Sequence, residues 1–171
     1  DGVYVVDESS DGQVSHANNN SYLGTTQIAS GTLMVSDNSQ LGDTHYNRQV
    51  IFTDKQQESV MEITSDVDTR SDAAGHGRDI EMRADGEVAV DAGVDTQWGA
   101  LMADSSGEHQ DEGSTLTKTG AGTLELTASG TTQSAVRVEE VTLKGEVAEI
   151  LRYASSLWVD DVATFVTRAD Q

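Results

Sequence analysis

Residues 116–126, LTKTGAGTLEL, show the sequence pattern that recurs along this chain. Two short runs of alternating apolar and polar residues flank a turn, and period-two alternation is typical of a half-buried β-strand. Gly120 and Gly122 favour a tight turn, because glycine adopts backbone angles that other residues avoid. The segment therefore predicts two short strands joined by a glycine turn.

The same alternation recurs in many short runs, each bounded by Gly, Asp, Asn or Ser, the residues that favour turns. These runs are Thr32–Val35, Val60–Ile63, Ile80–Met82, Val88–Val90, Val136–Val138, Val141–Leu143 and Thr164–Val166. The pattern predicts an all-β protein. Many short strands leave a sandwich, a barrel and a β-solenoid open as architectures.

An internal repeat favours the solenoid. Residues 22–35 can be laid on residues 132–145, which places Ile28 on Val138 and Leu33 on Leu143. The repeating unit is roughly 20 to 25 residues, within the range of solenoid repeats. Only 5% of the residues are aromatic, as expected of a core built from rows of small aliphatic side chains. At this period, about seven or eight coils would fit in the chain.

Two stretches carry a resemblance to a known family. Residues 116–126 are similar to one half of the passenger-associated transport repeat of bacterial autotransporters, and residues 20–33, continued by Leu41-Gly42, are similar to the other half. The residues that match the motif are Tyr22, Gly24, Gly31, Leu33, Gly120, Gly122 and Leu124.

The resemblance implies a right-handed parallel β-helix that is exported and displayed on the bacterial cell surface, outside the outer membrane. It implies adhesion or cell–cell self-association as the function, with host or bacterial surface molecules as partners and a translocator barrel in the full-length parent. A structural stalk, or an autochaperone-like segment that supports secretion, is the alternative. A polysaccharide-acting β-helix enzyme comes third.

The second copy departs from the repeat at Val141, where glycine usually precedes Thr-Leu, and the pairs 139–140 and 160–161 are acidic where glycine is more usual. A β-branched residue is strained at positive φ. Either Val141 adopts ordinary β geometry or this variant has been altered.

Two regions interrupt the strand pattern within the single predicted solenoid, residues 1–171. Residues 65–78 are polar and predict a loop excursion. In residues 144–158, Val147, Ile150, Leu151, Ala154 and Leu157 fall at helix-like spacing. This second region predicts a short helix or a loop that covers the side of the fold.

Charge and composition exclude several classes of protein. The chain has 30 Asp and Glu against 10 Lys and Arg, a net charge of −20, so we expect no nucleic-acid partner. The absence of cysteine excludes disulfides and thiol chemistry. The chain begins at Asp1 and has neither a signal-peptide pattern nor a long apolar run, so we interpret it as an internal fragment of a longer passenger.

Catalytic chemistry finds little support, and we assign no catalytic residue. His16, His45, His76 and His109 are isolated in polar surroundings without zinc spacing. Ser105 and Ser106 lack a nucleophile-elbow motif, and Lys118 with the following glycines lacks the spacing of a phosphate-binding loop. For a glycan-acting enzyme, the candidate acids for an exposed row are Glu62, Glu81, Asp91 and Glu125.

Calcium is the ligand that best suits this charge, although we predict no required cofactor. Asp66 with Asp68, and Asp91 with Asp95, offer clustered carboxylates in turns. Neither the EF-hand loop nor the glycine-rich nonapeptide repeat is present. The four aspartates are therefore candidates for weak calcium binding only.

Overall fold

The computed structural model describes residues 4–7, 13–15, 20–43, 48–54, 58–70, 77–103, 113–145 and 150–167. Within these ranges the fold is all-β, and the helical exception is one 3-10 turn, η1 (Asn38–Leu41). No described helix has the length and apolar character that crossing a membrane requires.

The strands are short, and most alternate between buried and half-exposed positions. They are β1 (Tyr4–Asp7), β2 (Gln13–Ser15), β3 (Thr26–Val35), β4 (Val50–Phe52), β5 (Ser59–Ile63), β6 (Ile80–Met82), β7 (Gly86–Val90), β8 (Asp95–Trp98), β9 (Leu101–Met102), β10 (Thr115–Thr119), β11 (Thr123–Leu126), β12 (Ala135–Val138), β13 (Val141–Gly145), β14 (Ser156–Val159) and β15 (Ala163–Thr167).

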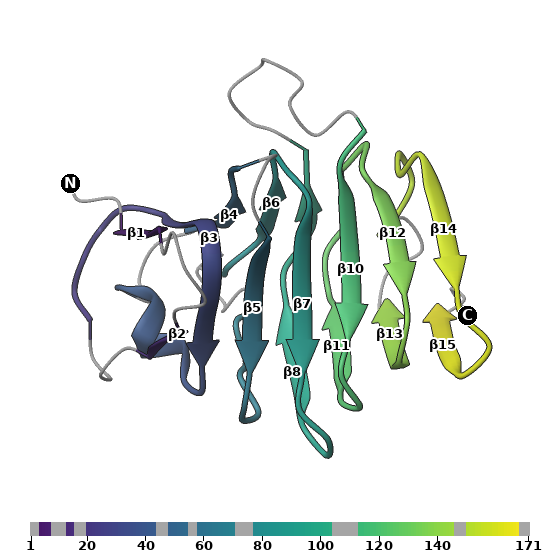
Figure 1. Ribbon diagram of the computed structural model, residues 1–171, viewed down its shortest axis with the longest axis horizontal. Coiled ribbons are helices and arrows are strands. Elements are labelled where there is room, and N and C mark those ends of the chain that lie inside the picture. The colour runs from purple at the N-terminus through teal and green to yellow at the C-terminus, as the bar shows by residue number, and fades with distance from the viewer. Residues whose placement is uncertain are drawn as a thin grey trace.

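The strands pair in parallel with strands of neighbouring coils and form three faces of a solenoid (Figure 1). Sheet A contains β1, the first part of β3, β4, β6 and β9. Sheet B contains β2, the second part of β3, β5, β7, β10, β12 and β14. Sheet C contains β8, β11, β13 and β15. The parallel β-solenoid predicted from the sequence is confirmed.

The number of coils differs from the prediction. An inward row of register partners runs along sheet B through Leu33, Met61, Val88, Lys118, Val138 and Val159. Successive members of this row are farther apart in the sequence before Lys118 than after it. The molecule therefore has about five coils rather than seven or eight, because the early coils are longer than the repeating unit expected from the sequence.

Aliphatic side chains from all three sheets fill the core, together with two aromatic ones. Phe52 and Trp98 are completely buried, and Trp98 Nε1 donates a hydrogen bond of 3.0 Å to Thr96 Oγ1. Gly86 in β7 leaves room for Phe52, because an added Cβ there would lie 2.4 Å from Phe52 Cγ. Among the described aromatic residues, Phe52 and Trp98 thus belong to the core, whereas Tyr153 and Trp158 are exposed.

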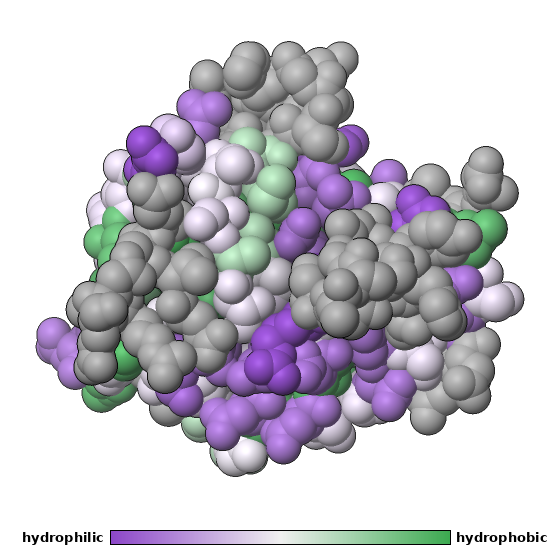
Figure 2. Space-filling model, turned by 180° about the vertical axis from the view of Figure 1, so that it is seen from behind, coloured by the Kyte–Doolittle hydropathy of each residue, from purple (hydrophilic) through white to green (hydrophobic). Residues whose placement is uncertain are grey.

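Seen from behind, the surface changes in hydropathy along its height (Figure 2). Hydrophilic side chains gather in the lower middle of this view, and paler to apolar ones lie in the middle above them. The strands of sheet B lie side by side toward the viewer in Figure 1, so the view from behind does not show the outer face of that sheet.

The predicted loop excursion at 65–78 is described only in part, since residues 71–76 lie outside the described ranges. In the described part, Val67 and Thr69 are buried, and Asp68 forms a parallel bridge with Gln97 of β8. Residues 66–70 therefore lie against sheet C and do not leave the body of the solenoid.

The region 144–158 contains the end of β13, a turn at 150–153 and the start of β14, while residues 146–149 lie outside the described ranges. No helix forms in its described part. Ile150 is buried, and an added Cβ at Gly145 would lie 2.0 Å from its Cδ1. Ile150 thus packs against the end of β13.

Val141 is the first residue of β13 and pairs with Ala163 of β15. Its backbone therefore follows ordinary strand geometry, the first of the two alternatives that the sequence left open. The acidic residues before it lie where the chain turns from sheet B to sheet C.

Candidate functional site

The repeat motif at 116–126 forms the corner between β10 in sheet B and β11 in sheet C. Gly120 has φ +71°, and an added Cβ would lie 2.4 Å from Val90 O of the preceding coil. At Gly122 an added Cβ would lie 2.3 Å from Asp91 O, and the Gly122 amide donates a 2.9 Å hydrogen bond to Val90 O. The two glycines therefore let one corner stack directly on the next.

Lys118 occupies an inward position of the same motif. It lies in register between Val88 and Val138 and is completely buried. Its Nζ donates hydrogen bonds of 2.5 Å to Thr119 O and 2.8 Å to Gly120 O. Burial lowers the pKa of Lys118 to about 8, against an opposing effect of Glu140. A lysine thus takes a core position and satisfies two carbonyls of the glycine corner.

The other half of the motif forms the corner within β3. Gly31 has φ +76° and lies where β3 passes from its pairing with β4 to its pairing with β5. Leu33 is buried, and the Tyr22 hydroxyl lies 2.5 Å from Thr26 Oγ1. Gly24 lies in the bend just before β3. Of the motif residues, Gly31, Gly120 and Gly122 therefore lie at corners between sheets, and Leu33 and Leu124 are buried two residues after such a corner.

The two copies of the internal repeat occupy different faces of the solenoid. Residues 26–30 lie in sheet A and 31–35 in sheet B, whereas 135–138 lie in sheet B and 141–145 in sheet C. The shared feature is therefore a strand–corner–strand unit, and one such unit is shorter than a full coil of three faces. This offset explains why the repeat length led to too many coils.

Arg78 ties two coils together in the N-terminal half. Its side chain is buried and donates to Asn38 Oδ1 at 2.5 Å and to Gly42 O at 2.9 Å. Gly42 has φ +85°, and an added Cβ would lie 2.6 Å from Tyr22 O. Arg78 therefore holds η1 and the turn after it against the following coil.

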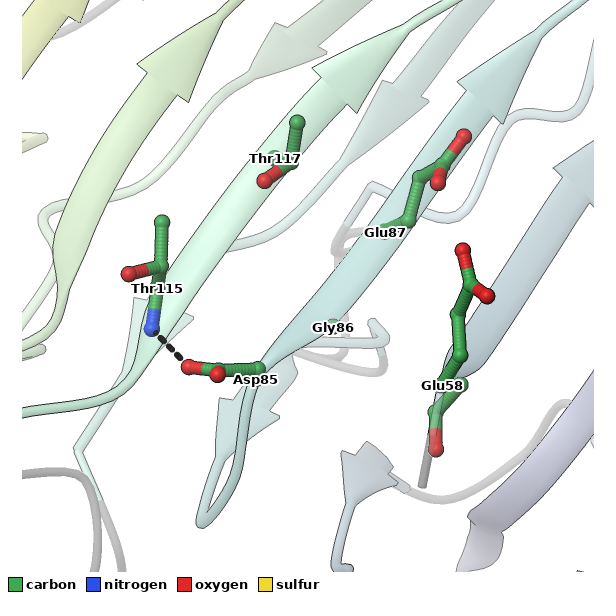
Figure 3. A pocket seen from close by; sticks show the side chains of 7 residues that line it. Glu58, Asp85, Gly86, Glu87, Thr115 and Thr117 are labelled. Atoms are coloured by element: carbon green, nitrogen blue, oxygen red, sulfur yellow. Dashed lines mark hydrogen bonds between the residues drawn. The ribbon is translucent and has the colours of Figure 1, made fainter. Parts of the chain in front are cut away.

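A shallow hollow opens on the outer face of sheet B (Figure 3). It is lined by Glu58, Ser59, Asp85, Gly86, Glu87, Thr115 and Thr117. Asp85 Oδ1 accepts a 2.7 Å hydrogen bond from the Thr115 amide, and Glu87 Oε1 accepts one of 2.5 Å from Thr119 Oγ1. Glu58 and Glu87 extend from neighbouring coils (Figure 3), so the hollow presents carboxylates beside threonine hydroxyls.

The calcium candidates are described, and the carboxylates of two of them have partners within the protein. Asp66 Oδ1 accepts a 2.8 Å hydrogen bond from the Asp95 amide. Asp68 pairs with Arg70 at 2.7 Å, and this hydrogen-bonded partner lowers the pKa of Asp68. Asp91 is exposed beside the Gly122 corner. Among the described residues, no three metal-binding side chains lie close enough to hold an ion.

The predicted row of acids for glycan cleavage does not form. Glu62 lies in β5 of sheet B, Glu81 in β6 of sheet A and Glu125 in β11 of sheet C, while Asp91 lies in a turn. Glu81 is buried and pairs with Arg83 at 2.7 Å, and Glu125 accepts a 2.7 Å hydrogen bond from Gln97. The row was wrong because these acids belong to three different faces.

The remaining candidates for chemistry lie outside the described residues. These are His16, His45, His76, His109, Ser105 and Ser106. The inward lysine was not recognised in the sequence, although a signal was available. Lys118 is two residues from Leu116, and alternate residues of a strand share a face. The alternation that predicts a buried Leu116 therefore also predicts that Lys118 faces the core.

The corners and stacked coils match a known repeat. A family model described as the passenger-associated-transport-repeat matches residues 17–35 and 116–140, the two stretches that carry the motif. The chain is thus a parallel β-solenoid that contains passenger-associated transport repeats. Over all 171 residues it is 93% identical to "Probable autotransporter YfaL" of Escherichia coli (strain K12).

The chain spans 14% of the length of that curated relative. No solved structure matches the chain. The repeat match and the identity together confirm the resemblance, and the chain fits a segment of an autotransporter passenger.

Proposed function

We propose that this segment is a rigid spacer within a longer surface-displayed passenger. The observation that carries this proposal is an exposed apolar edge of the core at β14, the outermost described strand of sheet B. Leu157 and Val159 are register partners of the buried Val136 and Val138, yet they are 38% and 42% exposed. Inward apolar side chains are normally buried by a stacked coil on each side. A further coil placed beside β14 would cover both.

The autotransporter relative supports a location outside the outer membrane, with a translocator barrel in the full-length parent as the structural partner. Parallel stacking of the described coils suits a spacer, because each coil contacts its neighbours and the length grows with the number of coils. In this proposal the segment carries no enzymatic activity and requires no cofactor. Calcium at Asp66, Asp68, Asp91 or Asp95 would be weak and dispensable.

The test compares cells that display the intact parent autotransporter with cells in which residues 1–171 are deleted. An epitope tag measures the surface level, and settling of the culture measures cell–cell contact. A spacer or folding segment predicts a fall in surface level when it is removed. Normal display with normal settling would contradict the spacer, because nothing would then depend on the segment.

Adhesion or self-association is the second candidate function, with host or bacterial surface molecules as partners. The observation that favours it is the polar outer face of sheet B with the hollow beside Glu58, Asp85 and Glu87. A flat, repeated face can make many weak contacts that add up to strong attachment. In the deletion experiment, this candidate predicts that surface level is kept while settling or attachment is lost.

A further inference from the structure

Trp158 projects from the outer face of sheet B. It pairs in register with Arg137 of β12, while its neighbours in β14, Leu157 and Val159, pair with the buried Val136 and Val138. Since alternate residues of a strand point to opposite faces, Trp158 faces outward. Its side chain is 63% exposed, which contrasts with the complete burial of the other tryptophan of the chain in the core.

The exposure of Trp158 does not depend on an absent neighbouring coil. Arg137 has strands on both sides, β10 and β14, and its side chain is still 43% exposed. A coil added beside β14 would pair with the strand edge and leave the outward side chain open in the same way. Trp158 would therefore remain accessible in a longer solenoid, whereas Leu157 and Val159 would not.

Charged side chains lie on the strand beside Trp158 and in the turn after it. Arg137 Nη2 lies 3.3 Å from Asp160 Oδ2, and Arg137 Nε lies 3.1 Å from Glu139 Oε1. The guanidinium thus lies near two half-exposed carboxylates, on the residue that is in register with Trp158. An apolar ring face next to oriented donors and acceptors suits a sugar, whose C–H face packs on an aromatic ring while its hydroxyls form hydrogen bonds.

The ring belongs to a row that reaches the acidic hollow. Register partners on the outer face run from Trp158 to Arg137, then Thr117, then Glu87. Neighbouring strands are about 4.8 Å apart, so the row covers about 14 Å along the solenoid. This length suits several linked sugars. The carboxylates of Glu58 and Glu87 at the far end would attract a cationic group.

We propose that the row Glu87, Thr117, Arg137 and Trp158 binds an oligosaccharide of amino sugars with free ammonium groups. Trp158 stacks on a ring, Thr117 and Arg137 hydrogen-bond to hydroxyls, and Glu87 with Glu58 accepts hydrogen bonds from an ammonium. This inference deepens the adhesive candidate function and is independent of the spacer function.

The test measures binding of the purified 171-residue chain to a β-1,4-linked glucosamine hexamer and to its N-acetylated counterpart by calorimetry. Trp158→Ala should weaken binding of the glucosamine hexamer at least about tenfold, as for a central aromatic contact. Tyr153→Ala is the matched control, because Tyr153 is also an exposed aromatic, 54% accessible, but lies in the turn before β14. Circular dichroism verifies that each variant is folded, and Trp158→Phe should retain part of the affinity.

A second pair of variants distinguishes binding at this row from general attraction of a cationic ligand by a chain of net charge −20. Glu58→Gln and Glu125→Gln each remove one negative charge, but only Glu58 lies at the hollow, since Glu125 belongs to sheet C. Weakening by Glu58→Gln alone supports the proposal. Equal weakening by both, unchanged binding of Trp158→Ala, or no binding by the wild type overturns it.

Tighter binding of the glucosamine hexamer than of the N-acetylated one supports the ammonium assignment, and equal binding of the two overturns it. The assay uses purified protein and no cells. Its failure would therefore leave the display and settling experiment unaffected, and the two proposals fail separately.

Discussion

The N-terminal and C-terminal halves of the solenoid close the third face of their coils differently. In the first half, each coil passes through sheet A, and β4 and β6 are buried at every position. In the second half, sheet A ends at β9, and the coils that carry β12 and β14 are shorter. The inward row of sheet B continues through both halves without losing register.

Turns take over the role of sheet A in the shorter coils. Gly130 lies against Leu101 O and Ile150 O, where an added Cβ would come within 2.7 and 2.2 Å. The Thr131 amide donates a 3.0 Å hydrogen bond to Leu101 O, and Ile150 fills the space beside Gly145. Sheets B and C therefore fix the register of these coils. The third face can be closed either by a strand of sheet A or by a turn that carries one apolar residue.

We expect the largest loss of stability from truncating the side chains that close the third face. Phe52 represents closure by a strand and Ile150 closure by a turn. Phe52→Ala should lower the free energy of unfolding by about 3–5 kcal/mol, because it empties a fully enclosed core site. Ile150→Ala should lower it by about 2–3 kcal/mol, toward the low end for an aliphatic truncation, since a turn relaxes more easily than a strand. Urea denaturation followed by circular dichroism measures both. A larger loss for Ile150→Ala would mean that the turn, and not sheet A, is the better packed closure.

The described coils of the second half share the corner between sheets B and C. A substitution at Gly122 tests how closely this corner packs on the preceding coil, and we expect it to destabilise the chain less than Phe52→Ala does. Gly122→Ala should destabilise the chain by about 1–3 kcal/mol, because the added Cβ meets Asp91 O of the preceding coil. Thermal unfolding measures the change. Gly93→Ala tests the other possible cost on its own, because Gly93 has φ +80° and an added Cβ there meets nothing within 4 Å, whereas Gly122 is not at positive φ. An unchanged melting temperature for Gly122→Ala would show that the neighbouring coil gives way to the added Cβ.

A pH-dependent effect concerns the single charge in the inward row of sheet B. Burial lowers the pKa of Lys118 from 10.5 to about 8, so between these values the unfolded chain binds more protons than the folded one. The free energy of unfolding should therefore rise as the pH increases from about 8 to 10.5. A deprotonated amine can still donate to the two corner carbonyls.

Lys118→Met, which has a neutral side chain of similar length, should lack this rise. Urea denaturation of both proteins at pH 7 and at pH 10 measures the difference between them. Lys144→Met is the control, because Lys144 is half-exposed in β13. A parallel pH dependence in wild type and Lys118→Met would show that the ammonium is not desolvated in the folded state.

The class of fold could be predicted from the sequence because its evidence is local. Alternation in runs such as Val60–Ile63 identifies strands, and glycines such as Gly120 identify corners. The number of coils could not be predicted, since it depends on which runs pair across the solenoid. Val50–Phe52 has no alternation, because sheet A is buried on both sides there, and a short apolar run does not reveal its partners.

The candidate site was less predictable than the fold. Trp158 and Glu87 are far apart in the sequence, and only the register through Thr117 and Arg137 brings them into one row. The acids proposed for a catalytic row were chosen from strands without knowing their faces, and a strand assignment alone does not specify which sheet it joins. Sequence reasoning did identify the corner residues, because their glycines reflect a backbone requirement that is visible in one short segment.

The constant register of sheet B across coils of unequal length has a consequence for how the genes of such proteins vary. Recombination that gains or loses an entire coil leaves every remaining side chain on its original face, whether that coil is a longer or a shorter one. Loss of a single residue inside a strand turns its apolar side chains toward water. Genes for such solenoids should therefore vary in steps of whole coils, with small insertions confined to the connections between strands.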